Sequence, residues 1–310
     1  MSTSTLFLLV LLLAWFLLEV RSGRPDGRVL GTHPYRRLMF FIMPKRNESL
    51  VFFDSPVDAT ALLAYLEQAG PRFDARLTHA LVAAGAVGLA ENPRMNRFVA
   101  GRRLYQRHGR WITFSMKRKK LDRTAKLSEV KLEMLDGETF EQLCRRIQAK
   151  VSEERSSRVT RDDREYDLFN KLPRPGLQIM NRALRLLDHY GLLPGSFIDG
   201  DGMFASMFVA NLGSLGMAPG YHHLYEWGTC PLFVMVGEVE ERPVAVDGEV
   251  VVRPILPIRY TYDERIDDGL NARFGIEAVK RVLEHPFEEL GCLAEDGSDA
   301  VPLSRTSPPG

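Results

Sequence analysis

The stretch Pro257-Ile-Arg-Tyr-Thr-Tyr-Asp-Glu-Arg-Ile-Asp-Asp-Gly269 predicts a strand that ends in a tight acidic turn. Its Tyr-Thr-Tyr segment favours a strand, and its Asp-Asp-Gly end is a turn signal. Apolar residues between Leu270 and Leu283 then recur at helical spacing, and Pro286 follows them. Strand, turn and helix in this order place several charged side chains on a short ledge, where we expect a functional site.

This ledge resembles the active-site signature of the chloramphenicol acetyltransferase-like superfamily. Residues 263–269 match the motif Asp-His-Arg-x-x-Asp-Gly of the dihydrolipoyl acyltransferases of 2-oxo acid dehydrogenase complexes, except that Glu264 replaces the family's catalytic histidine. The resemblance implies that Asp268 is held by an arginine and shapes the site. It also implies supporting roles for Asp263, Arg265 and Gly269.

The order of further motifs between about residues 50 and 286 also resembles that of the acyltransferase cores. The helix start Val57-Asp-Ala-Thr60 and the turn Asn92-Pro-Arg-Met-Asn96 follow each other as they do in the family. The resemblance implies an α/β fold, a two-layer sandwich of a mixed β-sheet and packed helices. It further implies a homotrimer with active sites between subunits, a coenzyme A thioester as cosubstrate, and no metal.

The exchange of histidine for glutamate leaves two hypotheses for the ledge. In the family, an imidazole removes the proton of a thiol or hydroxyl, which histidine suits because it titrates near neutral pH. A carboxylate is a weaker base at that pH, although burial strengthens it. Either Glu264 is an atypical base of an acyltransferase, or Glu264 and Asp268 are structural ion-pair partners in a catalytically inactive scaffold or thioester-binding pseudoenzyme.

A second candidate site is the run Ala210-Asn211-Leu212-Gly213. The family has Ser-Asn-Leu-Gly here, and its serine hydroxyl stabilises the tetrahedral oxyanion. Ala210 lacks that hydroxyl, and loss of one such donor typically costs about 10²–10³ in rate. Ser206 and Ser214 lie nearby but not at the family position. The run is equally consistent with a plain glycine-containing turn.

His222 and His223 form a third candidate, because the resemblance places their loop near the substrate channel. Adjacent histidines on a strand point to opposite faces, so at most one is expected to reach the site. The alternative is a pair of loop histidines bonded to backbone. A metal would need third and fourth ligands that the sequence does not supply.

The N-terminus carries thirteen uninterrupted apolar residues, 6–18. With Arg21, Arg24 and Arg28 after them, they predict a single-pass membrane anchor over residues 1–21, with the rest on the cytoplasmic face. A cleaved signal peptide is the rival. A start at Met39 or Met43 would instead leave a soluble cytoplasmic protein.

The remaining chain is expected to divide into a linker at 22–34, one acyltransferase-like domain at 35–292 and a disordered tail at 293–310. The cysteines Cys144, Cys230 and Cys292 lie far apart and are expected to be reduced. A net charge of +1 argues against nucleic-acid binding.

One basic run stands out from this balance. Residues 94–126 hold twelve Lys or Arg and a single acid, Asp122. The run is consistent with a solvated face on two strands, with contact to anionic lipid headgroups beside the anchor, or with coenzyme A phosphates.

Periodicity and turn signals complete the expected elements. Strands are predicted at 50–53, 103–105, 111–116, 127–134, 204–209 and 231–239, and a hairpin at 244–254. The strands at 103–105 and 111–116 are expected to pair around His108-Gly109. Helices are predicted at 57–68, 77–91, 137–154, 177–190 and 270–285, with a loop or exposed helix at 155–171.

Overall fold

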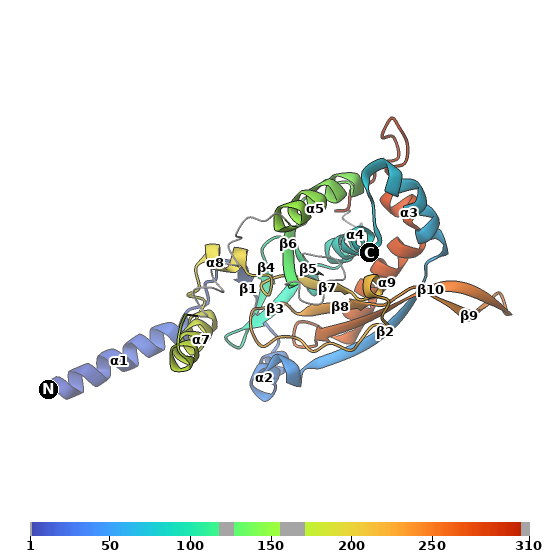
Figure 1. The fold of residues 1–310 in the computed structure, drawn as a ribbon. Coiled ribbons are helices and arrows are strands. Elements are labelled where there is room, and N and C mark those ends of the chain that lie inside the picture. Colours follow the sequence, from blue (N-terminus) through green and yellow to red (C-terminus); the bar gives the residue numbers. More distant parts are fainter. Residues whose placement is uncertain (1, 118–126, 156–170, 305–310) are drawn as a thin grey trace.

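The protein is built on a seven-stranded mixed sheet with helices packed against it (Figure 1). The computed structural model describes residues 2–117, 127–155 and 171–304. The sheet runs in the order β2-β10-β8-β7-β5-β6, and β9 extends β10 as a hairpin. Strands β5, β7 and β8 are parallel and their neighbours are antiparallel. The predicted α/β sandwich with a mixed sheet is confirmed.

The strands are β1 (Gly27–Val29), β2 (Leu50–Asp58), β3 (Arg97–Ala100), β4 (Arg103–Arg107), β5 (Trp111–Lys117), β6 (Leu127–Glu133), β7 (Met207–Asn211), β8 (Leu232–Val236), β9 (Glu240–Val246) and β10 (Glu249–Asp263). The α-helices are α1 (Thr3–Val20), α2 (Pro34–Ile42), α3 (Thr60–Phe73), α4 (Leu77–Glu91), α5 (Phe140–Arg155), α7 (Arg174–His189), α8 (Gly195–Gly200), α9 (Gly269–Glu284) and α10 (Pro286–Leu290). Short 3₁₀ turns lie at Arg46–Glu48 (η1), Pro93–Asn96 (η2) and Gly213–Leu215 (η3).

Helix α4 lies at the centre of the core because its residues are small and apolar all round. It packs between the sheet and α9, and most of its residues are buried. A Cβ at Gly85 would lie 2.0 Å from Met207 Cε, and one at Gly88 would lie 3.1 Å from Val279. The glycines therefore allow the helix to approach both neighbours closely.

A second, three-stranded sheet has the order β1-β4-β3. The predicted hairpin around His108-Gly109 is wrong, because β4 pairs with β3 and β1, while β5 pairs with β6 and β7. The actual hairpin turns at Gly101-Arg102, both with positive φ (53° and 59°). Two successive residues with left-handed backbone conformation fit the tight turn that joins twisted antiparallel strands. The pair Gly101-Arg102 therefore forms the hairpin turn that was predicted at His108-Gly109.

Two segments expected to be irregular are packed on the domain. Residues 22–34, expected as a linker, contain β1 and the buried Arg24. The expected disordered tail packs against the domain at Leu303. The side chain of Leu303 is buried, and its N–H donates to Glu138 O. The polar composition of these two segments predicts irregular structure. Backbone hydrogen bonds and the burial of Leu303 order them instead. The predicted loop or exposed helix at 155–171 falls almost entirely outside the described residues.

Among the α-helices in the described part of the chain, α1 and α7 have no buried residue. Helix α1 is apolar and long enough to cross a membrane by length and composition, a test that a signal sequence also passes. Helix α7 lies beside the C-terminal end of α1, at the end of the molecule away from α3 (Figure 1).

Candidate functional site

The acidic turn after β10 is held together by a buried ion pair. Both carboxylate oxygens of Asp263 accept hydrogen bonds from the Arg265 guanidinium, each at 2.8 Å. Ser49 Oγ donates to the same carboxylate at 2.8 Å, and Arg46 Nε lies 3.8 Å away. These partners satisfy the charge of Asp263, so its role here is to fix the turn.

Asp267, the next acidic residue, lies in a cluster of arginines. It is buried, and its carboxylate lies 3.0 Å from Arg97, 3.5 Å from Arg94 and 3.7 Å from Arg36. The first two belong to the basic run at 94–126. The same run also contains Arg107, which is buried and donates to Thr229. These members of the run therefore serve internal contacts, while its residues 118–126 lie outside the described part.

Asp268, expected to be held by an arginine, caps helix α9 instead. Its carboxylate accepts hydrogen bonds from Asn271 N at 3.2 Å and from Asn271 Nδ2 at 2.9 Å. The bonds from Asn271 hold the pKa of this carboxyl below its usual value. Gly269 is the first residue of α9, so Asp268 occupies the N-cap position. Helix capping therefore fixes Asp268, the residue four places after Glu264.

Glu264 is exposed on this turn. Its backbone is anchored on both sides, because its N–H donates to Ser49 O at 3.0 Å and its carbonyl accepts from Arg36 at 3.3 Å. The turn therefore presents the Glu264 side chain to the outside of the protomer from a fixed backbone.

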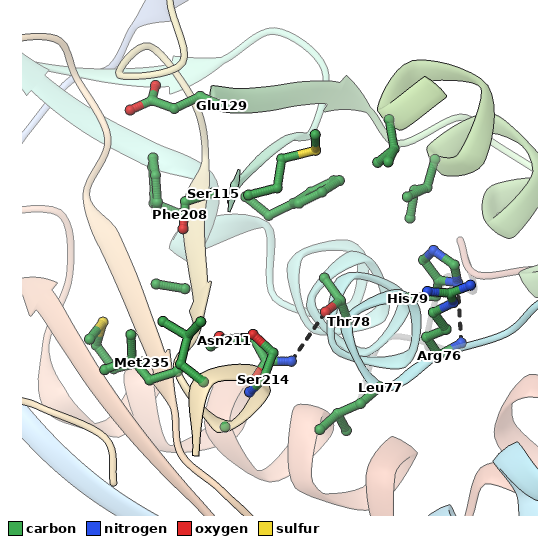
Figure 2. Close-up of a pocket in the computed structure, with 18 of the residues that line it drawn as sticks. Arg76, Leu77, Thr78, His79, Ser115, Glu129, Phe208, Asn211, Ser214 and Met235 are labelled. Atoms are coloured by element: carbon green, nitrogen blue, oxygen red, sulfur yellow. Dashed lines mark hydrogen bonds between the residues drawn. The ribbon is translucent and has the colours of Figure 1, made fainter. Parts of the chain in front are cut away.

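The second candidate site lies at the end of β7 and borders a cavity of about 850 Å³ (Figure 2). Asn211 Nδ2 donates to Thr78 Oγ1 at 3.1 Å, which links β7 to the first turn of α4. Ser214 N donates back to Asn211 Oδ1 at 3.2 Å. Gly213 is needed here because a Cβ would lie 2.3 Å from Gly237 O. The run 210–214 thus lies at the end of β7 beside the cavity, which it lines.

Most of the cavity wall is apolar, and it comes from the sheet and from helices α4 and α5. Its lining includes Phe114, Met116, Ile147, Val151, Phe208, Leu212, Phe233 and Met235. Polar groups of Arg76, Thr78, His79, Glu129 and Asn211 reach the same space (Figure 2). An apolar space with a few polar groups in its wall is typical of a small-molecule site.

The two histidines do not point to opposite faces, because residues 217–226 form a loop rather than a strand. Their rings stack with centroids 4.9 Å apart, and the His222 ring also stacks on Phe233 at 4.0 Å. Each Nδ1 lies within hydrogen-bond distance of a backbone carbonyl, that of His223 and that of Leu224 respectively. His222 lines the cavity, and burial lowers its pKa.

His79 is a cavity residue that the sequence reasoning missed. It lies buried in the first turn of α4, and its Nδ1 accepts the Arg76 N–H at 3.2 Å (Figure 2). Burial lowers its pKa to about 4, so the ring is neutral at physiological pH. The available signal was its position three residues after the helix N-cap, where a side chain reaches back to the cap.

The strand register separates the two candidate sites within one protomer. Tyr262 of β10 pairs with Leu232 at the start of β8, whereas Asn211 of β7 pairs with Val236 at its end. The intervening strand spans on the order of 13 Å, and Glu264 lies beyond its start. Glu264 and the Asn211 run therefore lie at opposite ends of β8, and Glu264 is not among the residues that line the cavity.

Comparison with known proteins gives similarity to one kind of acyltransferase over part of the chain. Residues 201–290 match the model of the 2-oxoacid dehydrogenases acyltransferase catalytic domain. The lipoamide acyltransferase component of the branched-chain alpha-keto acid dehydrogenase complex of Pseudomonas putida is 42% identical over 53 residues, 17% of this chain and 12% of that protein. The succinyltransferase component of the mitochondrial 2-oxoglutarate dehydrogenase complex of Saccharomyces cerevisiae is 44% identical over 52 residues, 17% of this chain and 11% of that protein.

Solved structures extend the likeness in fold to most of the chain. A probable dihydrolipoamide acetyltransferase from Listeria monocytogenes superposes with a TM-score of 0.57 and 18% identity, covering 86% of this chain and 98% of that one. The cubic core of a pyruvate dehydrogenase multienzyme complex gives a TM-score of 0.53 and 17% identity, covering 83% and 93%. The fold is therefore shared over a much longer stretch than the recognisable sequence.

Proposed function

Because this chain resembles the catalytic domain of the 2-oxo acid dehydrogenase acyltransferases, with Glu264 where that family has its histidine, we propose that it is an acyltransferase-type domain whose site forms between two copies. The observation that carries the proposal is the separation of Glu264 from the Asn211 run within one protomer, with Glu264 outside the cavity lining. A second copy that brings its Glu264 to the mouth of the cavity would complete the site. A homotrimer supplies this contact three times.

In the proposed reaction, the Glu264 carboxylate removes the proton from the thiol or hydroxyl of the acceptor. The resulting sulfur or oxygen attacks the acyl carbonyl of a coenzyme A thioester and forms a tetrahedral intermediate. The carbon–sulfur bond then breaks, and the coenzyme A sulfur leaves with the electron pair and takes the proton back from Glu264.

The oxyanion needs a donor, because Ala210 has none. We propose Thr78 for this role. Its Oγ1 accepts the Asn211 Nδ2 hydrogen bond, which leaves its own proton to be donated to another acceptor, and the residue lines the cavity. A hydroxyl already oriented by Asn211 can stabilise the developing charge without reorganisation.

The second candidate function is a catalytically inactive trimeric scaffold or thioester-binding subunit. Two observations favour it: a carboxylate replaces the imidazole at Glu264, and Ala210 replaces the serine of the family. Under this alternative, the cavity would still bind a thioester, and the buried pairs of the acidic turn would serve the fold.

Turnover by the full chain separates the two functions. Acetyl coenzyme A and dihydrolipoamide are the probes, and acetyl-dihydrolipoamide is measured by mass spectrometry with wild type, Glu264→Gln and Glu264→His. Activity that falls about 10²-fold or more in Glu264→Gln supports the enzyme. An inactive wild type combined with an active Glu264→His supports the scaffold.

We also propose that α1 tethers the chain to the cytoplasmic face of a membrane as a single-pass anchor. The helix has 18 residues with a mean hydropathy of 2.2, and none of it is buried in the protein. The arginines that follow it favour the cytoplasmic side for the rest of the chain.

A further inference from the structure

We propose that helix α7 lies in the surface of the same membrane, as an amphipathic helix parallel to the bilayer plane. The proposal rests on the tether through α1 described above. It concerns a surface that acyl transfer does not explain, because α7 lines neither candidate site.

The sequence of α7 divides its circumference into two halves. At 100° per residue, one half holds Leu177, Ile179, Met180, Leu184, Leu186 and Leu187. The other half holds Arg174, Arg182 and Arg185 among polar residues. An apolar half opposite a row of arginines is typical of helices that lie at the boundary of headgroups and acyl chains.

Most of the apolar half is uncovered. Ile179 is 68% exposed and Leu186 is 59% exposed, and no residue of α7 is buried. Leu184 alone packs against the neighbouring cluster of Leu193, Ile198 and Phe204. The helix therefore exposes part of its apolar surface, above all at Ile179 and Leu186, which is unfavourable in water.

The C-terminal ends of α7 and α1 are fixed to the same point. Arg24 is buried and donates to Asp188 at both its carbonyl (2.8 Å) and its carboxylate (2.9 Å). Tyr190 Oη lies 3.1 Å from the Glu19 carboxylate, one residue before the end of α1. Figure 1 shows the two helices side by side at this junction.

The position of this junction indicates which environment contacts the apolar half of α7. If α1 spans the hydrocarbon core, its C-terminal end lies at the membrane surface, because 18 residues rise about 27 Å and the core is about 30 Å thick. The end of α7 is then held at that surface too. The arginines of its polar half match the negative charge of anionic headgroups, so a lipid surface is the occupant that both geometry and charge favour.

A labelled full chain tests the inference. Cys144, Cys230 and Cys292 are all buried, so a thiol-reactive fluorophore can be directed to one added cysteine. Ile179→Cys places the label on the apolar half, and Arg185→Cys is the control, less than two turns away and near the middle of the polar half. Each protein is reconstituted into vesicles of phosphatidylcholine and phosphatidylserine, and flotation with the vesicles reports the tether separately.

We expect iodide quenching of the label at position 179 to fall several-fold relative to the label at 185. We also expect a nitroxide lipid labelled near the headgroup to quench the label at 179 more strongly. Equal iodide access at both positions in a protein that floats overturns the inference and leaves the tether standing. Protection at 179 without nitroxide quenching means that protein covers the helix and also overturns it. Failure to float overturns tether and inference together.

Discussion

Asp263 and Arg265 form a bidentate ion pair, in which the guanidinium donates a 2.8 Å hydrogen bond to each carboxylate oxygen. Both side chains are buried. The pair closes the turn that carries Glu264 between its two members. The same two residue types flank the catalytic position in the family motif, so the turn retains its support although the residue it presents has changed.

Removing one member of this pair should destabilise the fold strongly. For Arg265→Met we expect a loss of about 3–5 kcal/mol in the free energy of unfolding, because a buried carboxylate loses both hydrogen bonds from its guanidinium partner and keeps the more distant Arg46 at 3.8 Å. Urea denaturation measures it. The matched control is Arg273→Ala, which breaks an exposed pair with Glu277 and should change stability by less than about 0.5 kcal/mol. Equal effects in the two variants would contradict the structural role.

Much of the fold was predictable because it depends on local patterns. The strand formers Tyr260-Thr261-Tyr262 of β10, the turn at Asp267-Asp268-Gly269 and the small apolar residues of α4 are all visible in the sequence, and the structure has these elements in the expected order. The hairpin was placed wrongly because strand partners depend on contacts far along the chain. The pair Gly101-Arg102 is also a weaker indicator of a turn in the sequence than His108-Gly109.

The two motifs of the candidate sites are visible in the sequence, but their relative position in space is not. The sequence places Asn211 and Glu264 53 positions apart and does not say that they lie at opposite ends of the strands. That follows from the parallel pairing of β7 with β8 and the antiparallel pairing of β10. His79 was missed because a single histidine in an apolar helix gives no sign of facing a cavity.

Gly213 should be intolerant of a side chain. In Gly213→Ala the Cβ would lie 2.3 Å from Gly237 O, a backbone atom, so the strand ends must separate. We expect a loss of about 1–3 kcal/mol in thermal or urea unfolding. Gly220→Ala is the control, because its Cβ would meet only Met235 Cε at 3.9 Å. An unchanged Gly213→Ala protein would show that β7 and β8 are less close at this point.

The buried His79 should make folding stability depend on pH. Its pKa in the folded protein is about 4, below its ordinary value of 6.5, so the unfolded chain binds the proton first as the pH falls. The stabilisation is complete above pH 6.5 and is lost between 6.5 and 4. We expect a loss of about 2 kcal/mol by about pH 5 relative to neutral pH.

The variant His79→Gln isolates this contribution from other titrating groups. Glutamine keeps an acceptor for the Arg76 N–H but does not titrate. The difference in unfolding free energy between the wild type and His79→Gln should therefore shrink as the pH falls through this window. A difference that stays constant with pH would mean that His79 is accessible to protons in the folded state.

Thr78→Val should impair turnover while preserving the fold. The substitution keeps the shape but removes the hydroxyl proposed to stabilise the oxyanion, so we expect kcat to fall by about 10²–10³ with a smaller change in KM. Steady-state kinetics with acetyl coenzyme A measures the two separately. Ser214→Ala is the comparison, because its hydroxyl already donates to Asn211 O at 2.9 Å, and kcat should change little. A fall in kcat for Ser214→Ala alone would move the donor from Thr78 to Ser214.

Mixing two inactive variants tests whether the site is shared between copies. Glu264→Gln and Thr78→Val change opposite ends of the strands, so a shared site takes one group from each neighbour. Subunits unfolded, mixed in equal amounts and refolded should regain about a quarter of the wild-type sites, since each position is intact with a probability of one half. If both groups served the same chain, no mixed assembly would hold an intact site, and activity would stay at the level of the separate variants. Recovery after mixing therefore requires the two-copy site, and its absence in correctly assembled mixed oligomers would exclude it.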